Sequence, residues 1–144
     1  MNPIEIREAL ANDIDDVYRL VCELEDSQFS KPQFSEIYNR NIGKSSIAYF
    51  IAEQDDNVVG FASVYINDLL HHCGKVAEIQ EFVVSSEFQR RGIGNLLFVK
   101  MKQWSMEKNA LQIEVACNVL RTEAHQFYKA LGFTDSHKKF VHPM

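Results

Sequence analysis

Apolar positions along the chain recur with two different spacings. Spacings of three and four residues predict helices, and the chain contains four such stretches. They run from Asp13 through Leu24, over 31–42, from Gly92 through Trp104, and over 121–131. Asn12 or Asp13 is available to cap the first helix, and Gly132 suits the position just after the last one.

Alternation with a period of two, together with β-branched and aromatic residues, predicts strands over 4–9, 75–84, 111–117 and 137–141. Two further β-rich runs flank Asp55-Asp56-Asn57, a sequence that favours a hairpin turn. The predicted order is therefore β-α-α-β-β-β-α-β-α-β. An antiparallel meander followed by strands separated by helices indicates an α/β (α+β) fold with a mixed, mostly antiparallel sheet flanked by helices.

The totals exclude several classes of protein. No repeat or linker interrupts the chain, so we expect one domain over 1–144. A formal net charge of −5 argues against a nucleic-acid partner. No apolar run is long enough to span a membrane, and the first residues do not resemble a secretory signal, so we expect a cytoplasmic location. Three dispersed cysteines form neither a disulfide framework nor a zinc motif.

The stretch SSEFQRRGIGNLLF, residues 85–98, joins a predicted strand to a predicted helix. Gly92 and Gly94 would let an anion approach the backbone N–H groups at the helix start, and Arg90 and Arg91 add positive charge. An ordinary turn with solvated arginines is the alternative. No Lys-Ser/Thr follows, as a P-loop requires, and Leu97 stands where a dinucleotide fingerprint has a small residue.

Two motifs carry a resemblance to a known family. Gln89-Arg90-Arg91-Gly92-Ile93-Gly94 after a strand resembles the acetyl-coenzyme A loop of the GCN5-related N-acetyltransferase (GNAT) family, and AHQFYKALGF (124–133) is similar to a second family motif. The predicted element order is also that family's order. The resemblance implies an acetyl-coenzyme A-dependent N-acetyltransferase.

The resemblance also implies which residues hold the coenzyme. Its diphosphate would bind the backbone of Gln89, Arg90, Arg91, Gly92, Ile93, Gly94 and Asn95. The pantetheine arm would pair with the strand end at Phe82, Val83 and Val84, in a gap where this strand separates from the strand at 111–117. Asn118 either hydrogen-bonds the coenzyme or serves only as a turn residue.

Acetyl transfer to an amine requires a base, because an alkyl ammonium with a pKa of roughly 10 is deprotonated in only about one molecule per thousand at neutral pH. Glu78 and Glu81 lie in the predicted strand, and the resemblance favours Glu78. Simple alternation places Glu78 and Phe82 on one face and Glu81 on the other. A bulge is expected near residues 82–84.

Tyr128 lies at helical spacing within the second motif, which fits either a core aromatic or a functional residue. The resemblance assigns its hydroxyl the protonation of the departing thiolate. Direct attack in a ternary complex is the expected route. A covalent route through Cys117 would need an adjacent base that the sequence does not provide.

The segments LHH, EIQEFVV, AHQFY and SHKKF further resemble the bacterial aminoalkylphosphonate N-acetyltransferases, which depend on a divalent metal. The weak candidates for metal ligands are His71, His72 and Glu78. Other acceptors left open are a polyamine, an amino sugar and a peptide N-terminus. A non-catalytic acyl-coenzyme A sensor or interaction module is the alternative of another class. Exposed sheet edges make a homodimer plausible.

Overall fold

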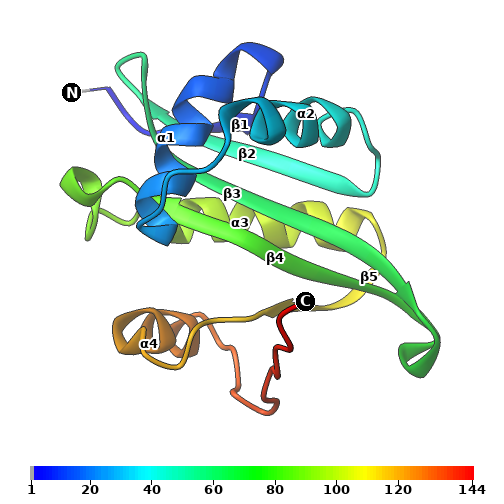
Figure 1. The fold of residues 1–144 in the computed structure, drawn as a ribbon. Coiled ribbons are helices and arrows are strands. Elements are labelled where there is room, and N and C mark those ends of the chain that lie inside the picture. Colours follow the sequence, from blue (N-terminus) through cyan, green and yellow to red (C-terminus); the bar gives the residue numbers. More distant parts are fainter. Residues whose placement is uncertain (1) are drawn as a thin grey trace.

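Five strands form one continuous sheet in the computed structural model, which describes residues 2–144 (Figure 1). The strands are β1 (Glu5–Glu8), β2 (Ile47–Gln54), β3 (Asn57–Leu69), β4 (Gly74–Val84) and β5 (Ala110–Val115). They follow one another in the sheet in chain order. The pairs from β1 to β4 are antiparallel, and only β5 runs parallel to its neighbour β4. The predicted mixed, mostly antiparallel sheet is confirmed.

Four α-helices connect and cover the strands: α1 (Ile14–Glu25), α2 (Lys31–Asn41), α3 (Ile93–Glu107) and α4 (Thr122–Ala130). Ser30 caps α2 by accepting a hydrogen bond from the N–H of Gln33 at 3.4 Å. Gly132 follows α4 with a φ of 98°, the left-handed conformation expected just after a helix. None of the helices within residues 2–144 has the length and apolar character needed to cross a membrane.

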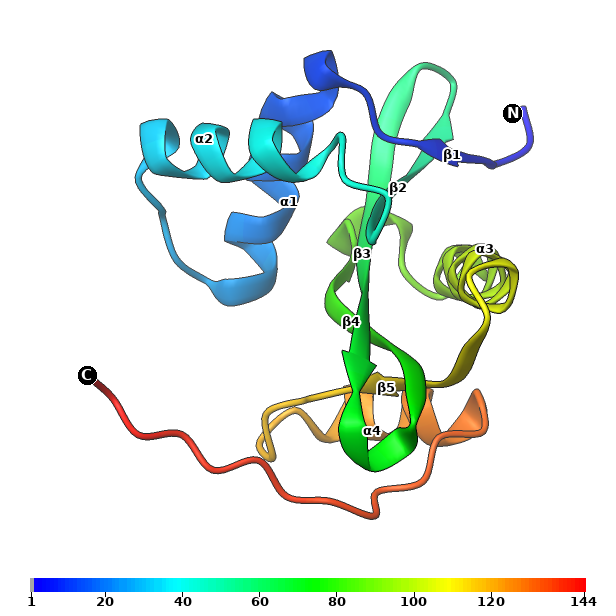
Figure 2. The same ribbon diagram turned by 90° about the vertical axis from the view of Figure 1, so that its right-hand side faces the viewer.

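The helices lie in two layers on opposite faces of the sheet. Figure 2 shows α1 and α2 on one side and α3 on the other. Two buried clusters fill the spaces between the layers. Phe50, Leu97 and Met101 belong to the cluster on the α3 side, whereas Leu20 and Phe61 belong to the cluster under α1 and α2. Both faces of the central strands are therefore apolar.

The structure tests two local predictions, the hairpin turn between β2 and β3 and the cap of α1. Asp55 and Asp56 have φ values of 51° and 64°, so the predicted hairpin between β2 and β3 turns with two left-handed residues. Asp13 precedes α1, but its carboxylate does not cap that helix. It accepts hydrogen bonds from Arg7 at 2.8 and 2.9 Å and from the Leu10 N–H at 2.7 Å. The hydrogen bonds from Arg7 lower the pKa of Asp13.

The predicted last strand is wrong. Residues 137–141 form no strand, and every residue from 134 to 144 is exposed. Alternating β-forming residues are present there, but a strand also needs a neighbour for its N–H and C=O groups. The segment lies away from the sheet of its own chain (Figure 2).

Candidate active site

The loop between β4 and α3 turns sharply before the helix begins. A short 3₁₀ turn covers Ser86–Phe88, and then Arg90 and Gly92 take left-handed φ values of 64° and 80°. Gly92 is the N-cap of α3 and has no side chain with which to cap it. The first N–H groups of α3 therefore lack a side-chain acceptor, and the helix dipole adds partial positive charge at the same place. This arrangement suits an anion such as a diphosphate.

Side-chain and backbone contacts hold this loop in position. The Gln89 side-chain amide donates to the Val84 carbonyl oxygen at 3.1 Å. The Arg91 guanidinium lies 5.0 Å from the centre of the Phe88 ring. The Ser86 N–H donates to the Glu23 carboxylate of α1 at 2.9 Å. Arg90 and Arg91 are both exposed, so their charges face the solvent beside the helix start.

Gly94 has a role that the sequence did not reveal. A Cβ atom at this position would lie 3.0 Å from the Phe127 ring of α4. Phe127 in turn packs against Phe82 and Tyr128, with ring centres 5.6 Å apart in each case. The glycine therefore allows α4, which carries Tyr128, to approach the start of α3.

Gly94→Ala is expected to destabilise the protein by about 1 kcal/mol and to lower the acetyl transfer that the family resemblance implies. Overpacking of this kind costs about 1–3 kcal/mol, and the gain in helix propensity offsets about 1 kcal/mol of it. Gly43→Ala is the matched control, because a Cβ there meets nothing within 4 Å. Urea unfolding and a thiol-release assay measure both effects. Equal behaviour of the two variants would contradict the packing role of Gly94.

Strands β4 and β5 separate at the end nearest this loop. They pair over residues 75–79 of β4, whereas Phe82, Val83 and Val84 pair only with β3. The backbone groups of this strand end that face β5 are therefore available to an extended ligand. The predicted gap between the two strands is present, and its use by a pantetheine arm stays a prediction.

A bulge in β4 changes the predicted faces. Ser63 of β3 pairs with Glu81 and Val64 pairs with Ile79, so Gln80 is an extra residue without a partner. A bulge was expected near residues 82–84, and it lies just before them. It interrupts the alternation between Glu78 and Glu81. The prediction that Glu78 shares a face with Phe82 is therefore wrong. Glu78 lies opposite Tyr65 on the side of α1 and α2, whereas Phe82 packs on the α3 side.

Glu78 and Glu81 consequently share the face that is covered by α1 and α2. Glu78 is half-buried, accepts a hydrogen bond from the Gln80 side chain at 2.6 Å, and lies opposite Glu114 of β5. Glu81 is more deeply placed and accepts a hydrogen bond from the hydroxyl of Ser63. Burial raises the pKa of Glu81, the Ser63 bond opposes this shift, and Glu25 of α1 adds to it. This face carries concentrated negative charge.

Sequence reasoning missed Ser63 altogether. A serine inside an apolar strand gives no signal by itself, and its partner is 18 residues away. Its hydroxyl also accepts a hydrogen bond from the Glu81 N–H at 2.9 Å, which holds the residue just after the bulge. Ser63 thus fixes the direction of the Glu81 side chain relative to Glu78.

Tyr128 lies among aromatic rings on the other face of the sheet. Its ring centre is 6.2 Å from Phe82 of β4 and 5.6 Å from Phe133. Burial raises the pKa of Tyr128 to about 12, with a smaller contribution in the same direction from Cys117. The hydroxyl is therefore protonated at neutral pH. Its helix brings it beside the separated end of β4, as a proton donor to a leaving thiolate would require.

Cys117 and Asn118 follow β5 and lie near this gap. Burial raises the pKa of the Cys117 thiol, which disfavours the thiolate needed for a covalent route. The Asn118 side-chain oxygen accepts a hydrogen bond from the Leu120 N–H at 2.9 Å. Asn118 therefore has the turn role that was one of its two interpretations, and contact with a coenzyme stays a prediction.

The candidate metal ligands are not gathered into one site. His71 and His72 lie in a 3₁₀ turn at the tip of the β3–β4 hairpin, with ring centres 4.4 Å apart. They therefore lie in a turn and not in a strand. The tip is at the opposite end of β4 from the loop that leads to α3 (Figure 1). Within residues 2–144 no three side chains of His, Cys, Asp or Glu form a group that could hold a metal ion. The proposed ligand set does not fit.

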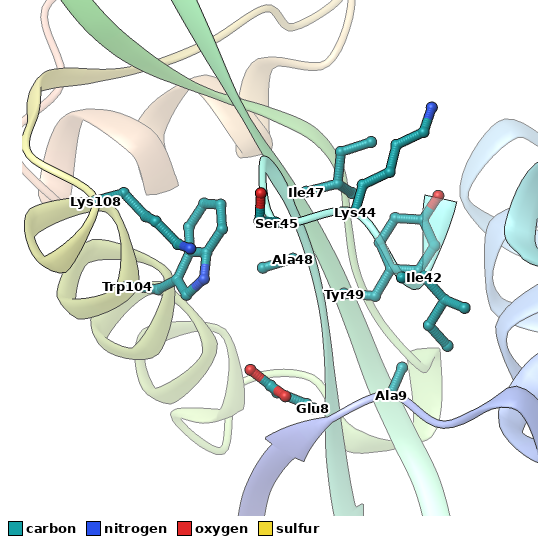
Figure 3. Close-up of a pocket in the computed structure, with 11 residues that line it drawn as sticks. Glu8, Ala9, Ile42, Lys44, Ser45, Ile47, Ala48, Tyr49, Trp104 and Lys108 are labelled. Carbon is teal, nitrogen blue, oxygen red and sulfur yellow. The ribbon is translucent and has the colours of Figure 1, made fainter. Parts of the chain in front are cut away.

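A pocket of about 230 Å³ lies elsewhere on the molecule, between the start of β2 and the end of α3. Figure 3 shows Trp104 and Lys108 on one side of β2 and Ile42 and Lys44 on the other, with Glu8 below them. None of the predicted site residues lines this pocket. The candidate site is therefore the open gap between β4 and β5 rather than this pocket.

Comparison with known proteins identifies the family to which the chain is similar. The acetyltransferase (GNAT) family matches residues 14–133. The aminoalkylphosphonate N-acetyltransferase of Salmonella typhimurium is 32% identical, with 95% of this chain and 89% of that protein covered. A crystal structure described as a transcriptional regulator from Bacillus halodurans superposes with a TM-score of 0.91 at 21% identity, covering 99% of this chain and all of that one.

A second solved structure contains the coenzyme. It is an aminoglycoside N-acetyltransferase in complex with CoA, with a TM-score of 0.88, 19% identity, and coverage of 99% of this chain and 95% of that one. Three observations agree with one another: the glycine loop at a helix start, the separated strands β4 and β5, and the family match over most of the chain. The chain thus belongs to the acetyltransferase (GNAT) family and is an N-acetyltransferase.

Proposed function

We propose that this enzyme acetylates the primary amine of a small molecule, with an aminoalkylphosphonate as the first candidate acceptor. The observation that supports the reaction is the gap between β4 and β5, which has carboxylates on one face and Tyr128 on the other. The relationship to the Salmonella enzyme, 32% identical over 95% of this chain, supports the acceptor.

In the proposed mechanism, backbone N–H groups of residues 89–95 bind the diphosphate of acetyl-CoA. The arm of the coenzyme pairs with the backbone of Phe82, Val83 and Val84, and the acetyl group lies in the gap. The loop and strand geometry described above supports both contacts, because N–H groups lacking side-chain acceptors lie at the helix start and the strand end has no neighbour on the β5 side.

The chemistry requires a base for the acceptor ammonium and an acid for the departing thiolate. Glu78 accepts a proton from the acceptor ammonium, directly or through water, and the free amine nitrogen attacks the carbonyl carbon of the thioester. A nitrogen–carbon bond forms, and the carbon–sulfur bond breaks as the tetrahedral intermediate collapses. The sulfur then takes the proton of the Tyr128 hydroxyl. The attacking nitrogen also loses a second proton as the amide forms, and this proton restores the Tyr128 hydroxyl through solvent. The products are the amide, CoA with a free thiol, and one proton, which Glu78 releases to solvent.

A polyamine is the second candidate acceptor, because one observation favours it. Glu78 and Glu81 share a face, Glu114 lies opposite Glu78, and Glu25 lies near Glu81. Such a face attracts a molecule with several positive charges and repels a phosphonate dianion. The chain's net charge of −5 acts in the same direction.

We also propose that the enzyme forms a homodimer, because the sheet has exposed edges.

Thiol release from acetyl-CoA should be measured over aminoalkylphosphonates, polyamines, amino sugars and peptides, with and without a chelator. Aminoalkylphosphonates are expected to give the highest kcat/KM. A preference for polyamines of about tenfold or more, equal to about 1.4 kcal/mol, would overturn the first acceptor and favour the second. Binding of acetyl-CoA with no thiol release for any amine would favour a non-catalytic binder of acyl-CoA.

A further inference from the structure

Three polar side chains form a hydrogen-bonded cluster at the end of α2. The side-chain nitrogen of Asn41 donates to the Tyr49 hydroxyl at 3.1 Å and to the Tyr65 hydroxyl at 3.2 Å. Asn41 and Tyr49 are buried, whereas Tyr65 is partly exposed. The three residues belong to different elements, α2, β2 and β3, so no spacing along the chain joins them. Tyr65 is the member of the cluster that a ligand can reach.

The hydrogen atoms of this cluster exceed the acceptors inside it. The amide nitrogen of Asn41 carries two hydrogens, and each tyrosine hydroxyl accepts one of them while keeping a proton of its own. One of these hydroxyl protons can bond the other hydroxyl oxygen, and the second has no acceptor within the cluster. Because a buried donor without a partner is costly, the remaining O–H is that of Tyr65, at the exposed side of the cluster.

Tyr65 lies in the same row across the sheet as the proposed base. It pairs with Glu78 of β4, and Glu78 pairs with Glu114 of β5. Opposite residues on one face have Cβ atoms about 4.5–5.5 Å apart, so one small molecule can contact both Tyr65 and Glu78. Strands β4 and β5 pair for only one residue beyond this row, up to Ile79. The row therefore borders the gap that forms the candidate site.

The surroundings keep the Tyr65 hydroxyl protonated. Burial raises the pKa of Tyr65, Tyr49 and the negative charge of Glu81 raise it further, and the bond from Asn41 opposes these effects. At neutral pH the hydroxyl is therefore a hydrogen-bond donor beside carboxylates, which are acceptors. An ammonium group suits the carboxylates but offers nothing to the hydroxyl, because it has only donors. The face complements a molecule with an ammonium group and an oxygen atom a short distance away.

We propose that Tyr65 is a specificity residue of this enzyme. Its O–H, directed by Asn41, donates a hydrogen bond to an oxygen of the acceptor while Glu78 receives the amine of the same molecule. This inference rests on the proposed acetylation of a small amine and narrows its acceptor to amines that carry a phosphonate, phosphate or carboxylate group. A polyamine has no oxygen and would leave the O–H unpaired. The hydroxyl also gives an anionic group a favourable contact on a face that otherwise repels it.

Tyr65→Phe tests this role, because it removes the hydroxyl and keeps the ring. With aminoethylphosphonate as the probe, the KM in the thiol-release assay is expected to rise about tenfold or more, the usual effect of losing a hydrogen bond to a charged group. The kcat is expected to change little, since the bond is present in the ground state and the transition state alike. Propylamine, in which a methyl group replaces the phosphonate, is expected to have the same KM with both enzymes.

Tyr38→Phe is the matched control. Tyr38 is buried on the same face, and its hydroxyl donates to the Leu10 carbonyl oxygen at 2.6 Å. This variant also loses one tyrosine hydrogen bond, but its KM for both amines is expected to stay that of the unaltered enzyme. A change equal to that of Tyr65→Phe would reduce the effect to a loss of packing and overturn the inference.

Asn41→Asp tests the direction of the hydroxyl. The substitution keeps the shape of the side chain and replaces two donors with acceptors, so the carboxylate takes the O–H of Tyr65. The KM for aminoethylphosphonate is expected to rise as in Tyr65→Phe. An unchanged KM would contradict the assigned direction and with it the inference.

The design separates failure of this inference from failure of the proposed function. Equal KM values of the Tyr65→Phe and unaltered enzymes for aminoethylphosphonate would overturn the inference alone, as would an unaltered enzyme that acetylates propylamine equally well. Thiol release with no amine at all would contradict the proposed function. Titration calorimetry in the presence of CoA still tests Tyr65 in that case, because it needs no turnover. Aminoethylphosphonate is expected to bind Tyr65→Phe about tenfold more weakly, and equal or unmeasurable affinities would overturn the role of Tyr65.

Discussion

Tyr128→Phe is expected to lower the rate of CoA release at saturating substrates by about 10²- to 10⁴-fold, the usual contribution of a positioned general acid. Phenylalanine keeps the ring contacts with Phe82 and Phe133 and removes only the hydroxyl. The thiolate would then leave without a proton donor. The KM for acetyl-CoA is expected to change little, because the loop and strand proposed to bind the coenzyme are unaltered.

The pH dependence provides an independent check. Burial raises the pKa of Tyr128 to about 12, so the unaltered hydroxyl stays protonated as the pH rises to that value. The proposed proton-donor role is therefore fully present at neutral pH and is expected to be lost only as the pH rises through about 12. Steady-state kinetics with Tyr18→Phe provide the matched control, because Tyr18 lies on α1 and bonds the Phe29 carbonyl oxygen. A Tyr128→Phe enzyme as fast as this control would refute the acid role.

Glu78→Gln is expected to lower the rate near pH 7 by about 10²-fold, the lower end of the range for a general base. Without a base, the reaction depends on the amine that is already deprotonated, and this fraction rises tenfold per pH unit up to a pKa of roughly 10. The deficit of the variant should therefore be largest near neutral pH and should shrink as the pH rises. Rates measured across this interval with one amine test the trend.

Two controls separate the base role from the charge of the acidic face. Glu114→Gln removes a carboxylate that lies opposite Glu78 on the neighbouring strand, and Glu81→Gln removes one on the same strand beyond the bulge. Both are expected to change the rate by less than about tenfold and to keep the wild-type pH profile. A loss in Glu81→Gln as large as in Glu78→Gln, with the same pH trend, would move the base to Glu81.

Local signals in the sequence determined most of the elements. Helical spacing, caps and turn residues act over a few positions, so α1 to α4, the Asp55-Asp56 turn and the Gly132 stop could be read directly. The glycine loop could also be predicted from the sequence, because the turn and the start of α3 both lie within the six residues 89–94. The family resemblance rested on the same short motifs, and the match over residues 14–133 agrees with it.

Only the tertiary structure decided how the elements combine at the site. The bulge at Gln80 depends on how β3 and β4 pair, and it places Glu78 and Glu81 on one face where alternation had separated them. The contact of Gly94 with Phe127 and the position of Tyr128 beside Phe82 join segments that lie far apart in the chain. Residues 137–141 illustrate the same limit, since strand-forming residues become a strand only beside a partner edge. The spacing of residues along the chain indicates local conformation. Strand register, side-chain contacts and strand partners depend on segments that come together only when the chain folds.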